Sequence, residues 1–66
     1  MNFYCAMEKR NGKWTVGTIH PVTMSMRPYG QVRDFETFEE SNEVAKDMAN
    51  GKYPWLADRG EFVNMR

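Results

Sequence analysis

The stretch Phe35-Glu-Thr-Phe-Glu-Glu-Ser-Asn-Glu-Val-Ala-Lys-Asp-Met-Ala-Asn-Gly51 decides the fold of this chain. Thr37 is followed three residues later by Glu40, the capping-box pattern in which each side chain satisfies the other's free backbone amide. Apolar residues then recur at helical spacing, and Asn50-Gly51 supplies a left-handed stop. The pattern predicts a helix over about 38–49, with a solvent side rich in carboxylates.

A hairpin is expected before this helix, because two β-rich runs flank Asn11-Gly12. This dipeptide accepts the positive φ angles of a type I′ turn. A two-residue loop would pair Arg10 with Lys13 and, further back, Met7 with Val16. With that register, alternation of side chains puts one apolar set on the core face. The set is Phe3, Cys5, Met7, Trp14 and Val16.

The remaining segments are shorter and less regular. Alternation over 22–26 predicts a short strand or extended edge, and Arg27-Pro-Tyr-Gly30 predicts a turn. Residues 31–35 are expected to form a strand that leads into the helix, and 61–65 a last strand. We therefore expect one α+β domain over residues 1–66, with an antiparallel sheet of three to four strands packed on one helix in the order β-β-(β)-β-α-β.

Composition narrows the possible chemistry. The 66 residues are 41% hydrophobic, enough for a small core, and contain one cysteine and one histidine. One cysteine cannot form an internal disulfide, and Cys5 and His20 supply no zinc ligand set. Neither residue lies in a nucleophile or acid-base motif. We expect no catalytic residue, no metal and no cofactor. The first ten residues have no long apolar run, so we expect neither a signal peptide nor a membrane span there and predict a cytoplasmic protein.

Charge is balanced overall but segregated along the chain. The formal net charge of zero argues against a dedicated phosphate-backbone binder. Residues 1–33 carry five lysines and arginines against one glutamate, whereas residues 34–47 carry six carboxylates against one lysine. Such a dipolar surface is suited to steering a charged partner.

Two groups of residues are candidates for binding a protein partner. The helix carboxylates Glu39, Glu40 and Glu43 form either a solvated face or a surface that docks on a basic partner. The loop residues Tyr53, Trp55 and Leu56 either fold back to cap the small core or anchor a partner, because tryptophan and tyrosine dominate interface hot spots. Both pairs of interpretations stay open on sequence grounds.

Nucleic acid is the alternative partner. Interleaved basic and aromatic residues could form a binding face on the sheet, in which rings stack on bases and cations contact phosphates. These residues are Lys13, Trp14, Arg27, Tyr29 and Arg33.

Two families share features with these residues. The hairpin Gly12-Lys13-Trp14, followed by Phe35-x-Thr37-x-x-Glu40 and Ala45, resembles the arm-DNA-binding domain of tyrosine recombinases, which implies a three-stranded sheet that reads DNA. The element order and the helix from Thr37 to Ala49 resemble the small bacteriophage-encoded proteins that bind and inhibit host enzymes. That second resemblance implies a non-enzymatic module that occludes a host protein in the bacterial cytoplasm. A homodimer through an open sheet edge stays possible.

Overall fold

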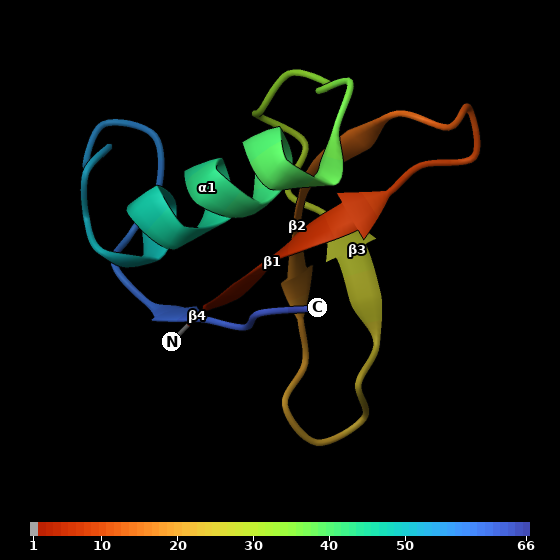
Figure 1. Ribbon diagram of the computed structural model, residues 1–66. Helices are drawn as coiled ribbons and strands as arrows, with labels where there is room; N and C mark the ends of the chain where they lie inside the picture. Colours follow the sequence, from red (N-terminus) through yellow and green to blue (C-terminus); the bar gives the residue numbers. More distant parts are fainter. Residues whose placement is uncertain (1) are drawn as a thin grey trace.

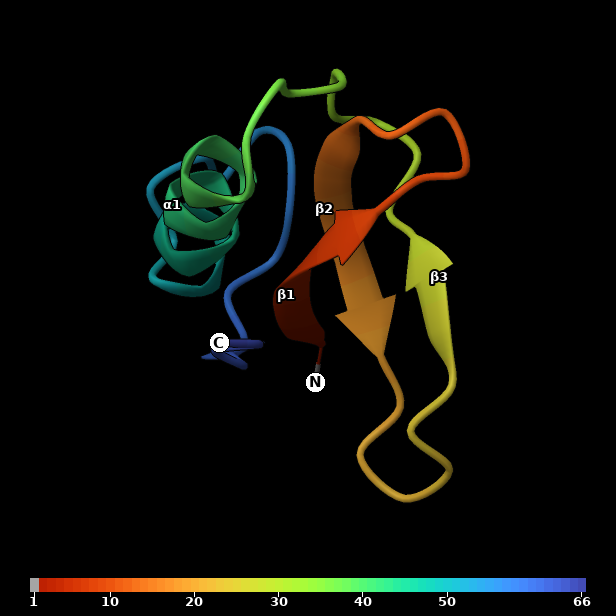
Figure 2. The ribbon, with the colours of Figure 1, turned by 45° about the vertical axis from the view of Figure 1, so that its right-hand side comes forward.

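The computed structural model describes residues 2–66 and shows a four-stranded sheet with one helix packed on it (Figure 1). Its elements, in chain order, are β1 (Phe3–Glu8), β2 (Trp14–Ile19), β3 (Met26–Pro28), α1 (Phe38–Ala49) and β4 (Glu61–Phe62). The sheet order is β3-β2-β1-β4, and α1 lies along one face (Figure 2). The α+β class is confirmed. The sheet is mostly antiparallel, as expected, and differs only in that β4 runs parallel to β1.

Helix α1 has the predicted bounds and the predicted N-cap. The Glu40 backbone N–H donates to Thr37 Oγ1 at 3.2 Å. The other half of the expected capping box differs, because the Glu40 carboxylate accepts from the Thr37 hydroxyl at 3.1 Å rather than from its backbone amide. At the other end Gly51 has φ +82, and its N–H donates to the Met48 carbonyl while that of Lys52 donates to Asp47. These two bonds form the Schellman ending that Asn50-Gly51 predicted.

The β1–β2 register is one residue away from the predicted register. Ala6 faces Val16 and Glu8 faces Trp14. The loop is longer than a type I′ turn: Gly12 N–H donates to the Lys9 carbonyl at 3.1 Å, and Lys9 N–H donates to the Lys13 carbonyl at 2.7 Å. Only Gly12 has a positive φ, as in a three-residue hairpin loop that ends in a glycine bulge.

This shift changes the faces of the hairpin, because a slip of one residue inverts the side chains of a strand. Tyr4 and Val16 pack with Ala45 and Met48 of α1 in the core. Cys5 is fully buried, as expected. By alternation, however, Phe3, Cys5 and Met7 point to the sheet face away from α1. The predicted core face is therefore a mixture of the two observed faces.

The segment between β2 and α1 also differs from the prediction. Residues 21–24 form the tip of the β2–β3 hairpin, which His20 and Ser25 close with a backbone hydrogen bond of 2.8 Å. The prediction was a strand over 22–26 followed by a turn from Arg27. Instead, β3 begins at Met26 and continues through Arg27 to Pro28. Residues 31–35 form no strand; within them only Phe35 pairs, in a bridge to Trp14. Among residues 2–66, no helix is long and apolar enough to cross a membrane.

Candidate functional site

The loop that follows α1 presents one large aromatic side chain to solvent. We call residues 52–58 the Trp55 loop. The Tyr53 carbonyl accepts from the backbone N–H groups of Leu56 at 2.9 Å and Ala57 at 3.0 Å, which closes a compact turn. Tyr53 and Leu56 pack against the core and Ala57 is buried, but Trp55 is 80% exposed. Tyr53 and Leu56 therefore anchor the loop, and the interpretation that Trp55 caps the core is wrong.

The exposed indole belongs to a chain of contacts that leads back to α1. The Tyr53 and Trp55 rings meet edge to face, with centroids 5.8 Å apart and planes at 77°. The Lys52 ammonium lies 5.7 Å from the centroid of the Tyr53 ring and pairs with Asp47 of α1 at 3.4 Å. The hydrogen bond that the Lys52 ammonium donates to the Asp47 carboxylate raises the pKa of Lys52. The C-terminal half of α1 and the Trp55 loop thus form one continuous surface.

A polar hollow of about 300 Å³ lies beside Trp55. Tyr29, Gln31, Trp55 and Asp58 contribute to its wall. The Tyr29 hydroxyl donates to the Leu56 carbonyl at 2.8 Å, which ties the loop to the segment after β3. Burial raises the pKa of Tyr29, and the charges of Tyr4 and Asp58 add to this effect.

The three helix glutamates expected to bind a partner are all exposed, but they differ in their contacts. Glu39 pairs with Arg66 at 2.9 Å; its own backbone N–H and then Arg66 lower the pKa of its carboxyl. Glu40 is engaged by the Thr37 cap. Glu43 has no ion-pair partner in the described part of the chain.

Position along the helix also separates these glutamates. α1 has 12 residues, so its ends are about 18 Å apart. Glu39 and Glu40 lie at the N-terminal end, whereas the Trp55 loop follows the C-terminal end (Figure 1). The predicted protein-binding residues are therefore not one patch, and only Glu43 lies toward the middle of the helix.

Ion pairs neutralise part of the basic face predicted for nucleic acid. Lys13 forms a short ion pair with Glu36, and this hydrogen bond raises the pKa of the lysine. Lys9 pairs with Asp34 at 2.9 Å, and its hydrogen bond lowers the pKa of the aspartate. Basic and acidic residues lie in different segments of the sequence. The fold brings these segments together, because Asp34 and Glu36, just before α1, reach the hairpin lysines.

The other residues of that predicted face are dispersed. The Trp14 ring meets Phe38 of α1 edge to face at 5.2 Å, and Tyr29 packs against the core. The Arg33 guanidinium lies 4.4 Å from the centroid of the Phe35 ring. Arg27 is exposed on β3. The two aromatic rings are thus used in packing rather than presented as a stacking platform.

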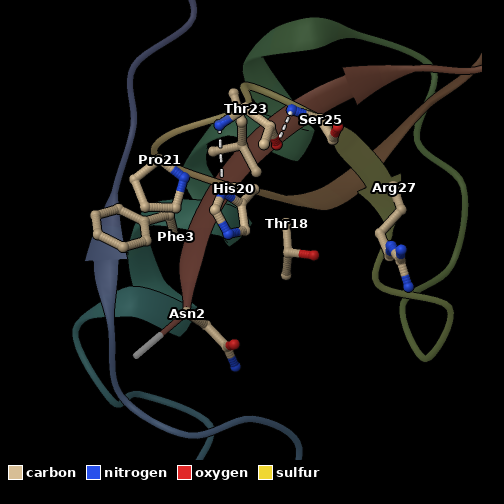
Figure 3. Close-up of a pocket in the computed structure, with 9 residues that line it drawn as sticks. Asn2, Phe3, Thr18, His20, Pro21, Thr23, Ser25 and Arg27 are labelled. Carbon is tan, nitrogen blue, oxygen red and sulfur yellow. Dashed lines mark hydrogen bonds between the residues drawn. The ribbon is translucent and has the colours of Figure 1, made fainter.

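A second hollow, of about 380 Å³, lies at the β2–β3 turn (Figure 3). His20 Nδ1 accepts from the backbone N–H groups of Val22 at 3.2 Å and Thr23 at 3.3 Å. The residues that line this hollow include no carboxylate and no thiol. The imidazole therefore shapes the turn. Val22 and Met24 project from it with exposures of 82% and 62%, a feature that alternation of residue types alone did not indicate.

The lone cysteine and the acidic residues form no recognisable reactive centre in residues 2–66. Burial raises the pKa of the Cys5 thiol, which keeps it protonated and shielded. Within the same range, no three side chains of histidine, cysteine, aspartate or glutamate gather in a metal-binding cluster.

No protein-family model, curated protein or solved structure matches this chain. Both resemblances, to the phage inhibitors and to the recombinase arm domains, therefore stay expectations. The exposed surfaces are the remaining basis for a functional proposal.

Proposed function

We propose that this protein is a non-enzymatic protein-binding module whose main contact surface is the Trp55 loop. One observation carries the proposal: an indole that is 80% exposed stands on a loop whose neighbouring residues are packed into the core. Tryptophan buries 150–250 Å² when it is covered, on the order of several kcal/mol of favourable transfer. A small domain that leaves such a side chain in water gains nothing for its own core.

The construction of the loop suits an interface anchor. Its turn is closed by two backbone hydrogen bonds to Tyr53, and Tyr29 adds a third contact through the Leu56 carbonyl. A side chain held on a rigid support loses little conformational freedom on binding. Trp55 is thus available to become a buried aromatic anchor when a partner covers it, as tryptophan does at the centre of many protein interfaces.

The carboxylates of α1 have a secondary role in this proposal. Glu43 and Asp47 lie on the part of α1 nearer the loop, and Glu39 and Glu40 add negative potential at the far end. Such charges accelerate the encounter with a basic surface more than they strengthen the final complex. Following the phage resemblance, the partner would be a host protein that the module inhibits or redirects by occlusion.

Nucleic acid is the competing hypothesis, and the geometry favours it less. Lys9 and Lys13 are each paired with a carboxylate, so a phosphate would have to displace that partner. Neutral net charge further weakens backbone attraction. A gel-shift titration that shows salt-sensitive binding at micromolar protein would replace the proposal with this alternative.

Substitution of Trp55 tests the proposal. Immobilised protein is incubated with host lysate, the retained protein is identified and purified, and its affinity is measured by calorimetry. We expect Trp55→Ala to weaken binding by at least about thirtyfold, since hot-spot truncations cost about 2 kcal/mol or more. Val22→Ala is the matched control, because Val22 is equally exposed but lies at the β2–β3 tip.

Loss of folding would not explain the expected result, because the Trp55 side chain is largely in water. Circular dichroism of each variant checks this point. Equal affinity of Trp55→Ala and the unaltered protein for the retained partner would refute the proposal.

A further inference from the structure

We propose that the outer side of β1 from Ala6 to Glu8, which we call the free edge, pairs with an extended segment of a partner protein that joins the sheet as a further strand. The hollow beside this edge is lined by Phe38, at the N-terminal end of α1, whereas the Trp55 loop follows the C-terminal end. The free edge is therefore a second contact surface, and it does not depend on the Trp55 loop.

β4 covers only the beginning of the outer side of β1. The two strands pair at Phe3 and Tyr4, and the hydrogen bond from the Val63 N–H to the Tyr4 carbonyl, at 2.8 Å, is the last one between them. Beyond it the chain turns to α1, where the Arg66 guanidinium lies 4.4 Å from the centroid of the Phe38 ring. In the described part of the chain, no strand therefore pairs with the rest of this side.

The backbone groups of Ala6 and Glu8 point to the free edge. Lys9 N–H donates to the Lys13 carbonyl, so in this register the odd-numbered residues of β1 face β2 and the even-numbered residues face outward. No hydrogen bond joins the backbone of Ala6 or Glu8 to another described residue on that side. Ala6 is only 2% exposed, where an unpaired amide is costly. A strand placed alongside would satisfy these groups.

A hollow of about 470 Å³ lies beside the free edge, and its wall is mostly apolar. Met7 and Met26 reach it from the sheet face away from α1, as alternation along the strands requires. Trp14 and Phe38 reach it from the other face, where their rings meet edge to face, and Met65 adds to the wall. An added strand would therefore place successive apolar side chains against these two groups, and methionine adapts to varied partners.

Backbone chemistry and charge identify the occupant as an extended polypeptide with a basic residue. Such a chain carries N–H and carbonyl groups at the spacing of the free edge. Glu8 is exposed at the end of this edge and has no ion-pair partner among residues 2–66, so a lysine or arginine opposite it would complete the contact. β1 of a second copy has no lysine or arginine over Phe3–Glu8 and would leave Glu8 unpaired.

Peptide titration followed by NMR provides the test. The ¹⁵N-labelled protein is titrated up to millimolar concentrations with acetyl-Lys-Val-Leu-Val-Lys-amide. The matched control is the same peptide with its three central amides N-methylated, which keeps the side chains and removes the backbone donors. We expect the amide signals of Ala6 and Glu8 to shift and saturate, and their hydrogen exchange to slow, only with the unmethylated peptide.

Two variants at Glu8 test the backbone donor from the side of the protein. Glu8→Pro removes the outward N–H at a sheet edge, where proline is tolerated, whereas Glu8→Ala keeps it. We expect the peptide to bind Glu8→Pro at least about fivefold more weakly than Glu8→Ala, since one hydrogen bond is lost. Val22→Ala, at the β2–β3 tip, should bind like the unaltered protein. Circular dichroism checks folding, and the comparison of the two peptides needs no variant.

The outcomes separate the free edge from the Trp55 loop. Equal shifts with both peptides, no shift with either, or equal affinity of Glu8→Pro and Glu8→Ala overturns the strand pairing. Slow exchange of Ala6 and Glu8 in the protein alone, together with sedimentation as a dimer, would assign the edge to a second copy and overturn it as well. A captured partner that stays bound to Trp55→Ala refutes the contact through Trp55 and leaves the peptide result standing.

Discussion

Met24 is the only residue other than glycine with a left-handed backbone in residues 2–66, at φ +62. An unbranched side chain with a Cβ atom adopts this conformation at a cost of about 1–2 kcal/mol. The turn around it overrides the cost: Met24 N–H donates to the His20 carbonyl, and His20 Nδ1 accepts from two further N–H groups. Like Trp55, Met24 places an apolar side chain in water at a backbone position that the surrounding hydrogen bonds determine.

Replacement of Met24 by asparagine is expected to stabilise the protein by up to about 1 kcal/mol, because asparagine tolerates the left-handed region through its short polar side chain. The methionine side chain is 62% exposed, so little burial is lost. Urea unfolding followed by circular dichroism measures the change. Met24→Ala is the control, since alanine keeps the backbone cost. Equal stability of the two variants would show that the backbone at this position is not strained.

At the scale of the element, α1 and the β1–β2 hairpin differ in how far nearby residues determine their structure. Both ends of α1 are closed by contacts within three residues of the cap: Thr37 with Glu40, and Gly51 with Met48. The hairpin loop is less determined, because Asn11-Gly12 is compatible with a two-residue or a three-residue loop. The Asn11 side chain accepts from Lys13 N–H at 2.9 Å, a contact that favours the longer loop.

Removal of the N-cap tests how much α1 depends on its first turn. We expect Thr37→Ala to destabilise the protein by about 1 kcal/mol, because the Glu40 N–H loses its acceptor. Thr37→Ser keeps the hydroxyl and should stay close to the unaltered protein. Thermal unfolding of the three proteins checks this, and a similar loss in both variants would assign the effect to the threonine methyl group instead of the cap.

At the scale of the whole molecule, the last strand closes the sheet against the first. Glu61 N–H donates to the Asn2 carbonyl at 2.9 Å, and Val63 N–H to the Tyr4 carbonyl at 2.8 Å. The opposite edge is β3, where Tyr29 N–H points to Val16 and alternation turns Pro28 outward. Because proline has no N–H to offer, it blunts this edge. Pro28 therefore makes β3 a poor edge for pairing with a second copy, while at the other edge the last strand, β4, lies beside the first, β1 (Figure 1).

Deletion of residues 61–66 is expected to lower the free energy of unfolding by about 2–4 kcal/mol, from two lost backbone hydrogen bonds and the loss of partly buried Phe62. Chemical denaturation measures it. Deletion of residues 65–66 alone keeps β4 and removes the Met65 side chain and the Arg66 contacts with Glu39 and Phe38. If the two deletions have the same effect, β4 does not close the sheet.

The sequence by itself determined the features whose signals are local: the bounds of α1, its Thr37 N-cap, its Schellman ending and the α+β class. Contacts between distant segments decided the rest. The hairpin register depends on which apolar set meets α1, the parallel β4 on the return of the chain to Asn2, and the loss of the basic face on Asp34 and Glu36 reaching the hairpin lysines. Trp55 illustrates the limit for the candidate site. Tryptophan is a residue type that fits a core or an interface. The tertiary structure decides between them, because Tyr53 and Leu56 pack against the core and the Trp55 indole lies in water.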